Sequence, residues 1–290
     1  MMVVKPSIGE KIFNVFNVIF MIFMIFICLY PFWYCITCSL SRDIVGNTGT
    51  LMLWPKGFSF EPYTHVLKNP LIVNGYKVTI FVVVTATVLN LVATTIAAFL
   101  LTRRNFAIKN FITVMMLITM YFSGGMIPTY MVYSRILGLR DSLLVLILPG
   151  AISVYNCIVM KSNFEGIHRS LEESVMVDGG NDMHVLWHII VPLSKAVMAV
   201  MVLFYGVGHW NAWFDALLYI TDPKKIPLQL ALRSILIESQ VDQNSGADNY
   251  ATAENIKFAT ILVATLPILC IYPFIQKYFV KGVMVGAIKG

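Results

Sequence analysis

Charged residues are scarce in this 290-residue chain: Asp, Glu, Lys and Arg make up 12% of it, about half the share found in ordinary soluble domains. Hydrophobic residues make up 58%, and the mean hydropathy is +0.77. This composition excludes an ordinary soluble domain and indicates an integral membrane protein. The net charge of +6 comes from basic residues scattered between apolar runs. Such scatter is typical of membrane topology signals and not of a nucleic-acid-binding stripe.

The motifs of hydrolytic chemistry are also missing from the sequence. It has no G-x-x-x-x-G-K-[ST] phosphate loop, so an ATP-driven step must draw its energy from another polypeptide. No clustered acid pair and no nucleophile with a base lies near the end of an expected helix. Glu172 and Glu173 are adjacent and therefore point about 100° apart on a helix. We expect no catalytic residues, and a membrane-embedded enzyme is the weakest hypothesis.

The cysteines and histidines predict neither a redox site nor a metal site. Cys35 and Cys38 form a CxxC, but no βαβ pattern surrounds them. His184 and His188 lie one helical turn apart, yet Val185 occupies the place of the glutamate in the zinc motif H-E-x-x-H. We therefore expect this chain to bind no metal and no cofactor.

Six apolar runs predict an all-α polytopic membrane protein. The expected spans are Ile12–Leu40, Val78–Leu101, Phe111–Tyr133, Ser142–Met160, Leu193–Ile220 and Lys257–Pro273. The first run is too long for a cleaved signal peptide. Arg103, Arg104 and Lys109 follow the second span without an acid between them, which predicts that this loop and both termini are cytoplasmic. We expect one transmembrane domain over 1–290, with a cytoplasmic loop at 164–192 and outer loops at 41–70 and 221–255.

Two of the spans carry residues that are unfavourable in lipid. In the third, Gly124, Gly125 and Pro128 should kink the helix, and the residues alone leave a packing kink and a transport pathway equally open. In the fifth, Asn211 and Asp215 lie one turn apart and should face protein or water.

Trp210 and Trp213 flank these polar groups. Aromatic rings beside amide and carboxylate groups suit a sugar site, because the rings cover the apolar faces of a pyranose. The alternative interpretation of the two tryptophans is an aromatic belt at the membrane interface.

A polar stretch between two apolar runs, Glu172–Pro192, reads EESVMVDGGNDMHVLWHIIVP. It predicts a short helix, a glycine turn and a second helix at a membrane surface. Gly179 and Gly180 permit a positive φ or a close backbone approach. Pro192 should begin the next segment, because it cannot continue a helix without the loss of a hydrogen bond.

This stretch resembles the EAA loop of binding-protein-dependent ABC importer permeases, which reads E-A-A-x-x-D-G-A and then, about a dozen residues later, I-x-L-P. Five positions match, whereas Ser174, Val175, Gly180 and Val191 depart from the motif. The resemblance implies the following ATPase-coupling residues: Glu173, Ser174, Asp178, Gly179, Gly180, Ile189 and Pro192.

Three further segments resemble carbohydrate permeases. LWPKGFSFEPYTHVL is similar to their first outer loop, and the C-terminal stretch 279–290 is similar to their terminal signature. SGGMIPTY with LGLRDSLLVLILPGAISVYN resembles the complex-polysaccharide subgroup and favours a pathway role for the broken third span. The candidate pathway residues are Tyr130, Asn156, Trp210, Asn211, Trp213 and Asp215.

The resemblance implies a type I ABC importer permease in a bacterial cytoplasmic membrane, forming half of the pathway for an oligo- or polysaccharide. Its implied partners are a second homologous permease in a heterodimer, two ATPase subunits that hold ATP and magnesium, and an external binding protein. A permease of the same superfamily for a peptide or glycerol phosphate stays an alternative.

Overall fold

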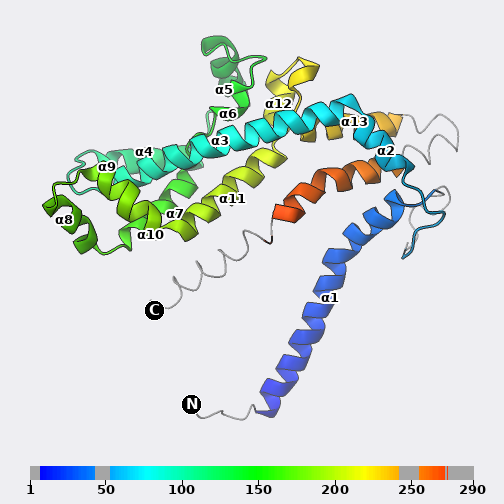
Figure 1. The fold of residues 1–290 in the computed structure, drawn as a ribbon, viewed down its shortest axis with the longest axis horizontal. Coiled ribbons are helices and arrows are strands. Elements are labelled where there is room, and N and C mark those ends of the chain that lie inside the picture. The colour runs from blue at the N-terminus through cyan, green and yellow to red at the C-terminus, as the bar shows by residue number, and fades with distance from the viewer. Residues whose placement is uncertain (1–6, 43–52, 242–254, 272, 274–290) are drawn as a thin grey trace. The chain divides into compact units, whose positions relative to one another are not determined.

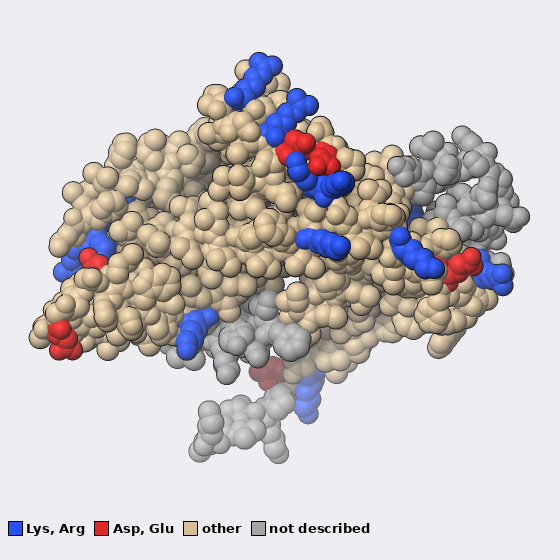
Figure 2. All heavy atoms as spheres, turned by 45° about the horizontal axis from the view of Figure 1, so that its top comes forward, with Lys and Arg blue, Asp and Glu red and all other residues tan. Residues whose placement is uncertain are grey.

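The computed structural model describes residues 7–42, 53–241, 255–271 and 273. These residues form helices, with one isolated β-bridge between Ser41 and Phe58. The chain divides into a first unit, Met1–Asn69 with Ser234–Thr265, and a second unit, Pro70–Arg233 with Leu266–Gly290. Uncharged residues form most of the surface visible in Figure 2, as the sparse charge of the sequence predicts.

The first unit contains α1 (Ile8–Ser39) and α2 (Glu61–Lys68). A capping box begins α1: Ser7 Oγ accepts from the Glu10 N–H at 3.2 Å, and Glu10 Oε2 accepts from the Ser7 N–H at 2.6 Å. The predicted first span is confirmed as a helix that is long and apolar enough to cross a membrane. None of its most apolar window is buried within the chain, so these side chains need lipid or another polypeptide around them.

The second unit is arranged around α3 (Pro70–Thr102), a helix of 33 residues and therefore about 50 Å long. α7 (Val154–Glu165) and α11 (Lys195–Asn211) pack along it (Figure 1). Asn90, fully buried on α3, donates to the Gly150 carbonyl at 2.8 Å and accepts from His209 Nε2 at 2.8 Å. One turn further on, Thr94 bonds Tyr205 at 2.6 Å. Because these groups are buried in apolar surroundings, their pairing fixes the register of α3 against α11.

The predicted third span is broken, as its glycines indicate. α4 (Lys109–Tyr121) is followed by α5 (Met126–Met131) and the π-helix η1 (Val132–Ile136), with a bend of 112°. Gly125 lies at the break with φ +86°, a conformation that favours glycine.

Two other predicted spans are not the continuous helices that we expected. Ser142–Met160 contains α6 (Leu144–Ile147), a turn with Gly150 at φ +72°, and then α7. α11 ends at Asn211, and α12 (Phe214–Tyr219) begins after Ala212, whose ψ of 123° is extended. Pro149 and Gly150 account for the first break, because neither favours a helix interior.

The remaining described elements are short. They are α8 (Arg169–Val177), α9 (Asp182–Val185), the π-helix η2 (Leu186–Ile190), α10 (Val191–Leu193), the 3₁₀ turn η3 (Pro223–Lys225), α13 (Leu228–Val241) and a helix at Asn255–Ile271. By length and composition, two described helices can cross a membrane, or four if each bent pair is one span. Six spans therefore stay a prediction. The C-terminal stretch 279–290 and residues 242–254 of the predicted outer loop lie outside the described residues.

Candidate functional site

The turn between α8 and α9 needs both of its glycines, each for a different reason. Gly179 has φ +81°, in the left-handed region that side chains with a Cβ rarely adopt. Gly180 donates its N–H to the Val175 carbonyl at 2.8 Å, and a Cβ there would lie 2.5 Å from Val175 Cγ1. Asn181 then caps α9 by accepting from the His184 N–H at 2.9 Å. The predicted helix, glycine turn and second helix are thus present.

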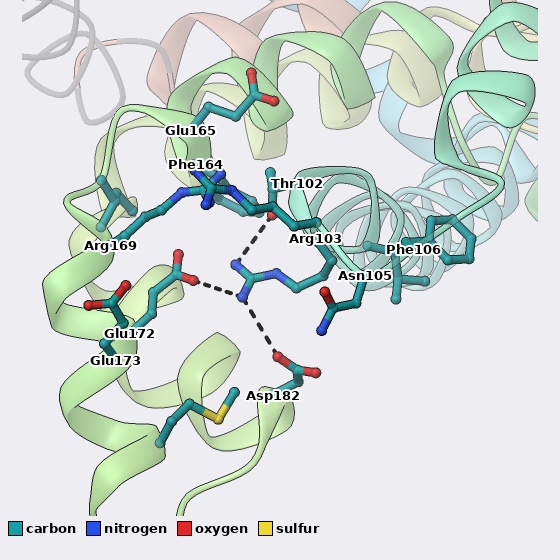
Figure 3. Close-up of a pocket in the computed structure, with 14 residues that line it drawn as sticks. Thr102, Arg103, Asn105, Phe106, Phe164, Glu165, Arg169, Glu172, Glu173 and Asp182 are labelled. Carbon is teal, nitrogen blue, oxygen red and sulfur yellow. Dashed lines mark hydrogen bonds and ion pairs between the residues drawn. The ribbon is translucent and has the colours of Figure 1, made fainter.

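A hollow of about 620 Å³ lies beside this turn. The end of α3, the loop that follows it, the end of α7, and α8 with the start of α9 line it (Figure 3). We call it the loop hollow. Charged side chains from the loop after α3, from α8 and from α9 converge in it, so it joins segments that are far apart in the sequence.

Arg103, one residue beyond α3, is the centre of the loop hollow. Its Nη1 lies 2.7 Å from Glu172 Oε2 and 3.6 Å from Asp182 Oδ1 (Figure 3). The side chains of Arg103 and Glu172 are 18% and 16% exposed, whereas that of Asp182 is 60% exposed. The guanidinium carbon lies 4.1 Å from the Phe99 ring centroid, within cation–π range. The pair with Glu172 is therefore the strong one, because water screens it less.

The EAA-type residues predicted from the sequence surround this arrangement. Glu173 lines the loop hollow, and Asp178 follows α8 in an exposed position. Ser174 Oγ donates back to the Leu171 carbonyl at 2.9 Å, and Ile189 is half-buried in η2. These positions stay predictions as contacts to a partner.

Pro192 requires a correction. It lies inside α10 and does not begin the next segment. The chain turns by 84° between Asp182–Leu193 and Lys195–Asn211, so the break is at Ser194. Asp182–Leu193 is one helical run, and Pro192 lies near its end, shortly after the π-helix η2.

Sequence reasoning missed the ion pair between Arg103 and Glu172. Arg103 was interpreted only as a topology signal, and Glu172 only as a neighbour of Glu173. The available signal was a charged residue directly after a long charge-free run and an acid in the first turn of a short helix. Neither signal identifies the partner.

The second unit also contains a group of rings that we call the tyrosine cluster: Tyr130, Tyr133, Trp213 and Tyr219. Tyr130 stacks on Tyr219 with centroids 5.3 Å apart, and Tyr133 meets the same ring edge-on at 6.0 Å. Trp213 packs against the buried group that contains Tyr219. Asp215 is in the first turn of α12, one helical turn before Tyr219. Three predicted pathway residues, Tyr130, Trp213 and Asp215, are thus brought together.

The other predicted pathway residues lie elsewhere. Trp210 is buried against Tyr76 of α3, with centroids 6.2 Å apart, and Asn156 is buried on α7. Asn211 donates to the Val207 carbonyl at 3.0 Å. Because the chain breaks after Asn211, it does not share a helix with Asp215, and our expectation that the two lie one turn apart on one helix was wrong.

Arg233 adds a charge to the tyrosine cluster that the sequence analysis did not single out. Its guanidinium carbon lies 3.9 Å from the centroid of the Trp213 ring. Among the residues that the structure describes, no carboxylate forms an ion pair with it. The guanidinium edge can therefore accept an acidic ligand while its face stays on the indole.

Asp141 fastens the loop after η1 to the segment after α12. It has φ +57°, unusual for a residue with a side chain, and its Oδ1 accepts from the N–H groups of Thr221 and Asp222, both at 3.0 Å. Lys225 Nζ donates to the Asp141 carbonyl at 2.6 Å and lies 3.7 Å from its carboxylate. The backbone N–H groups of Asp222 and Thr221, with the charge of Lys225, lower the pKa of Asp141.

Curated relatives match almost the whole chain, although no family model matches it. The chain is 40% identical to Protein LplC of Bacillus subtilis, over 97% of the chain and 96% of that protein. It is 37% identical to the polygalacturonan/rhamnogalacturonan transport system permease protein YtcP of the same species, over 97% of the chain and 99% of the relative.

Solved structures also match this chain. One chain of a bacterial ABC transporter that imports the acidic polysaccharide alginate matches with a TM-score of 0.87 and 30% identity. The match covers 95% of this chain and 99% of that one. A second match, at 13% identity and a TM-score of 0.52, supports the fold alone.

Proposed function

Because the chain belongs to the family of carbohydrate ABC-importer permeases, we propose that it forms half of the translocation pathway of an ATP-driven importer. A second, homologous permease supplies the other half as a heterodimer. Two ATPase subunits bind ATP and magnesium, and an external binding protein delivers the sugar. This chain binds no cofactor of its own. The absence of a phosphate loop in the sequence supports the assignment of ATP hydrolysis to separate subunits.

The chain crosses a bacterial cytoplasmic membrane six times, with both termini inside. Two long apolar helices, the bent pair of α4 with α5 and η1, and α11, the second half of the other bent pair, support four of these crossings. α7 and Asn255–Ile271 are the candidates for the others. Arg103, Arg104 and Lys109 support a cytoplasmic position of the loop hollow by the positive-inside rule.

The α8–α9 loop is the site at which the ATPase acts. The tight turn at Gly179 and Gly180 carries this proposal, because it holds two short helices together as one rigid projection. At the end of α8 the apolar side chain of Val177 is 86% exposed, next to the exposed Asp178. An apolar side chain beside a carboxylate at the tip of such a projection fits a protein partner.

The tyrosine cluster and Asp215 contribute to the sugar pathway. Aromatic faces and hydroxyl groups suit a pyranose, and Arg233 over Trp213 suits a sugar that carries a carboxylate. The permease and importer named above handle polygalacturonan, rhamnogalacturonan and alginate. We therefore propose an acidic oligosaccharide as the substrate.

Purification of the tagged chain from its native membrane, with mass identification of the proteins bound to it, tests this function. We expect a second permease and an ATPase subunit. Recovery of the chain alone, in a form that transports or turns over substrate without ATP, would contradict the proposal.

A further inference from the structure

We propose that Arg103 is a positioning residue that pins the α8–α9 loop to the end of α3, so that a displacement of the loop moves α3 as well as α11. This inference rests on the proposed coupling function of the loop. It assigns a role to a residue outside the EAA-type motif.

Without Arg103 the loop would be attached through the chain itself and through α9 and η2, whose residues Val185, Leu186 and Ile190 are buried in the same apolar cluster as the end of α3. From α9 the backbone runs through η2 and α10 to Ser194, where it bends by 84° into α11. α8 has no buried residue, so apolar packing alone holds it weakly. A force on the loop would then reach α11 directly and α3 only through packing between the helices.

Arg103 provides the second attachment. It contacts Glu172 on α8 and Asp182 on α9, which lie on opposite sides of the glycine turn (Figure 3). A single guanidinium therefore joins three helix ends. Its planar group, with several N–H donors, suits this task better than an ammonium group would.

The side chain of Arg103 is itself held in place by α3. Its guanidinium lies over the ring of Phe99, one turn back in α3, and its Nη2 is 3.4 Å from Thr102 Oγ1. With 18% of the arginine and 16% of Glu172 exposed, removal of one partner leaves the other charge poorly solvated. Separation of Arg103 from Glu172 is therefore energetically unfavourable.

α3 is the helix against which both α7 and α11 pack, and Asn90 and Thr94 fix its register to α11. A displacement delivered at Arg103 is thus passed from α3 to α7 and α11. Coupling of this kind is carried by contiguous contacts between packed elements. It also requires a contact at one end that differs between the two states of the importer.

The test compares Arg103→Gln with Arg104→Gln in the complete importer, reconstituted in lipid vesicles with its ATPase and binding protein. Arg104 is the adjacent residue with the same charge, and the described part of the chain gives it no ion pair. We expect Arg103→Gln to lower the sugar imported per ATP hydrolysed by about five- to tenfold, with the ATPase still bound. Arg104→Gln should stay within about twofold of the wild type.

A charge exchange separates pinning from folding. The exchange variant Arg103→Glu with Glu172→Arg, made together with Asp182→Asn so that the new carboxylate does not face another acid, should recover most of the import per ATP, because the same two positions are again paired. Normal coupling in Arg103→Gln, equal losses in both glutamine variants, or a well-assembled exchange variant that stays uncoupled would each overturn the proposal. If Arg103→Gln fails to assemble, the exchange variant alone decides. Failure of the wild-type chain to bind an ATPase would instead contradict the proposed function.

Discussion

The loop hollow and the tyrosine cluster are both built at breaks in helices of the second unit, but different interactions hold them together. In the loop hollow a charge pair joins the end of α3 to α8, beside a turn that only glycines fit. In the tyrosine cluster, rings from α5, η1 and α12 stack, and one arginine lies over an indole. A charge pair beside a rigid turn can transmit a displacement from one helix to another, whereas aromatic ring faces can bind a ligand in more than one orientation.

This difference separates the expected phenotypes. Changes in the loop hollow should lower the sugar imported per ATP. Changes in the tyrosine cluster should lower the rate of import while each completed cycle still consumes the same ATP.

The largest effect is expected at Gly179. Gly179→Val should lower import at least tenfold, because a branched side chain at φ +81° costs roughly 1–2 kcal/mol and distorts the turn. Gly179→Asn is the matched control, since asparagine adopts this conformation more readily. Import and ATP hydrolysis in vesicles measure the effect, and equal activity in the two variants would refute the need for the turn.

Trp213→Ala should lower import about five- to tenfold, because it removes the ring that lies beneath Arg233 and packs against the buried group containing Tyr219. Trp213→Phe should retain part of the activity. Initial rates and ATP consumption, measured together, check the result. If import per ATP falls as far as it does in Gly179→Val, the distinction between the two regions fails.

Asp141→Asn should change how stability depends on pH. Because the folded state lowers the pKa of Asp141, its ionised form stabilises the fold above the ordinary aspartate pKa of about 3.9. This contribution is lost as the pH falls through the lowered value. The wild type should therefore have the higher Tm at pH 7, and the two melting curves should converge in acid. A constant Tm difference from pH 7 to the acid limit would contradict the account.

Asp182→Asn should have the smallest effect, with less than about twofold loss of import per ATP, since the residue is 60% exposed and 3.6 Å from Arg103. High salt should remove even this difference in vesicle assays. A loss as large as that of Arg103→Gln would mean that Asp182, and not Glu172, holds the pin.

The sequence predicted those features that depend on local chemistry. The long apolar runs predicted α1 and α3, and the glycine pairs predicted the break before α5 and the turn after α8. Each of these is decided by residues that are neighbours in the chain.

Features that depend on tertiary packing were missed. Nothing near Arg103 indicates that its partner is Glu172, because the two meet only after the helices pack. Neither Ala212 nor Trp213 is a glycine or a proline, so the sequence did not predict that α11 ends at Asn211. At Pro149 and Gly150 a local signal was present, but the apolar length of the run outweighed it in our prediction.

The most direct test of the account is the amount of sugar imported per ATP hydrolysed by the complete importer in vesicles, for the wild type, Gly179→Val and Trp213→Ala. The account predicts a fall in this ratio for Gly179→Val, with ATP hydrolysis continuing. It predicts a ratio near that of the wild type for Trp213→Ala, with both rates lower. An unchanged ratio in Gly179→Val would contradict the assignment of the α8–α9 loop as the place where ATP hydrolysis drives the permease.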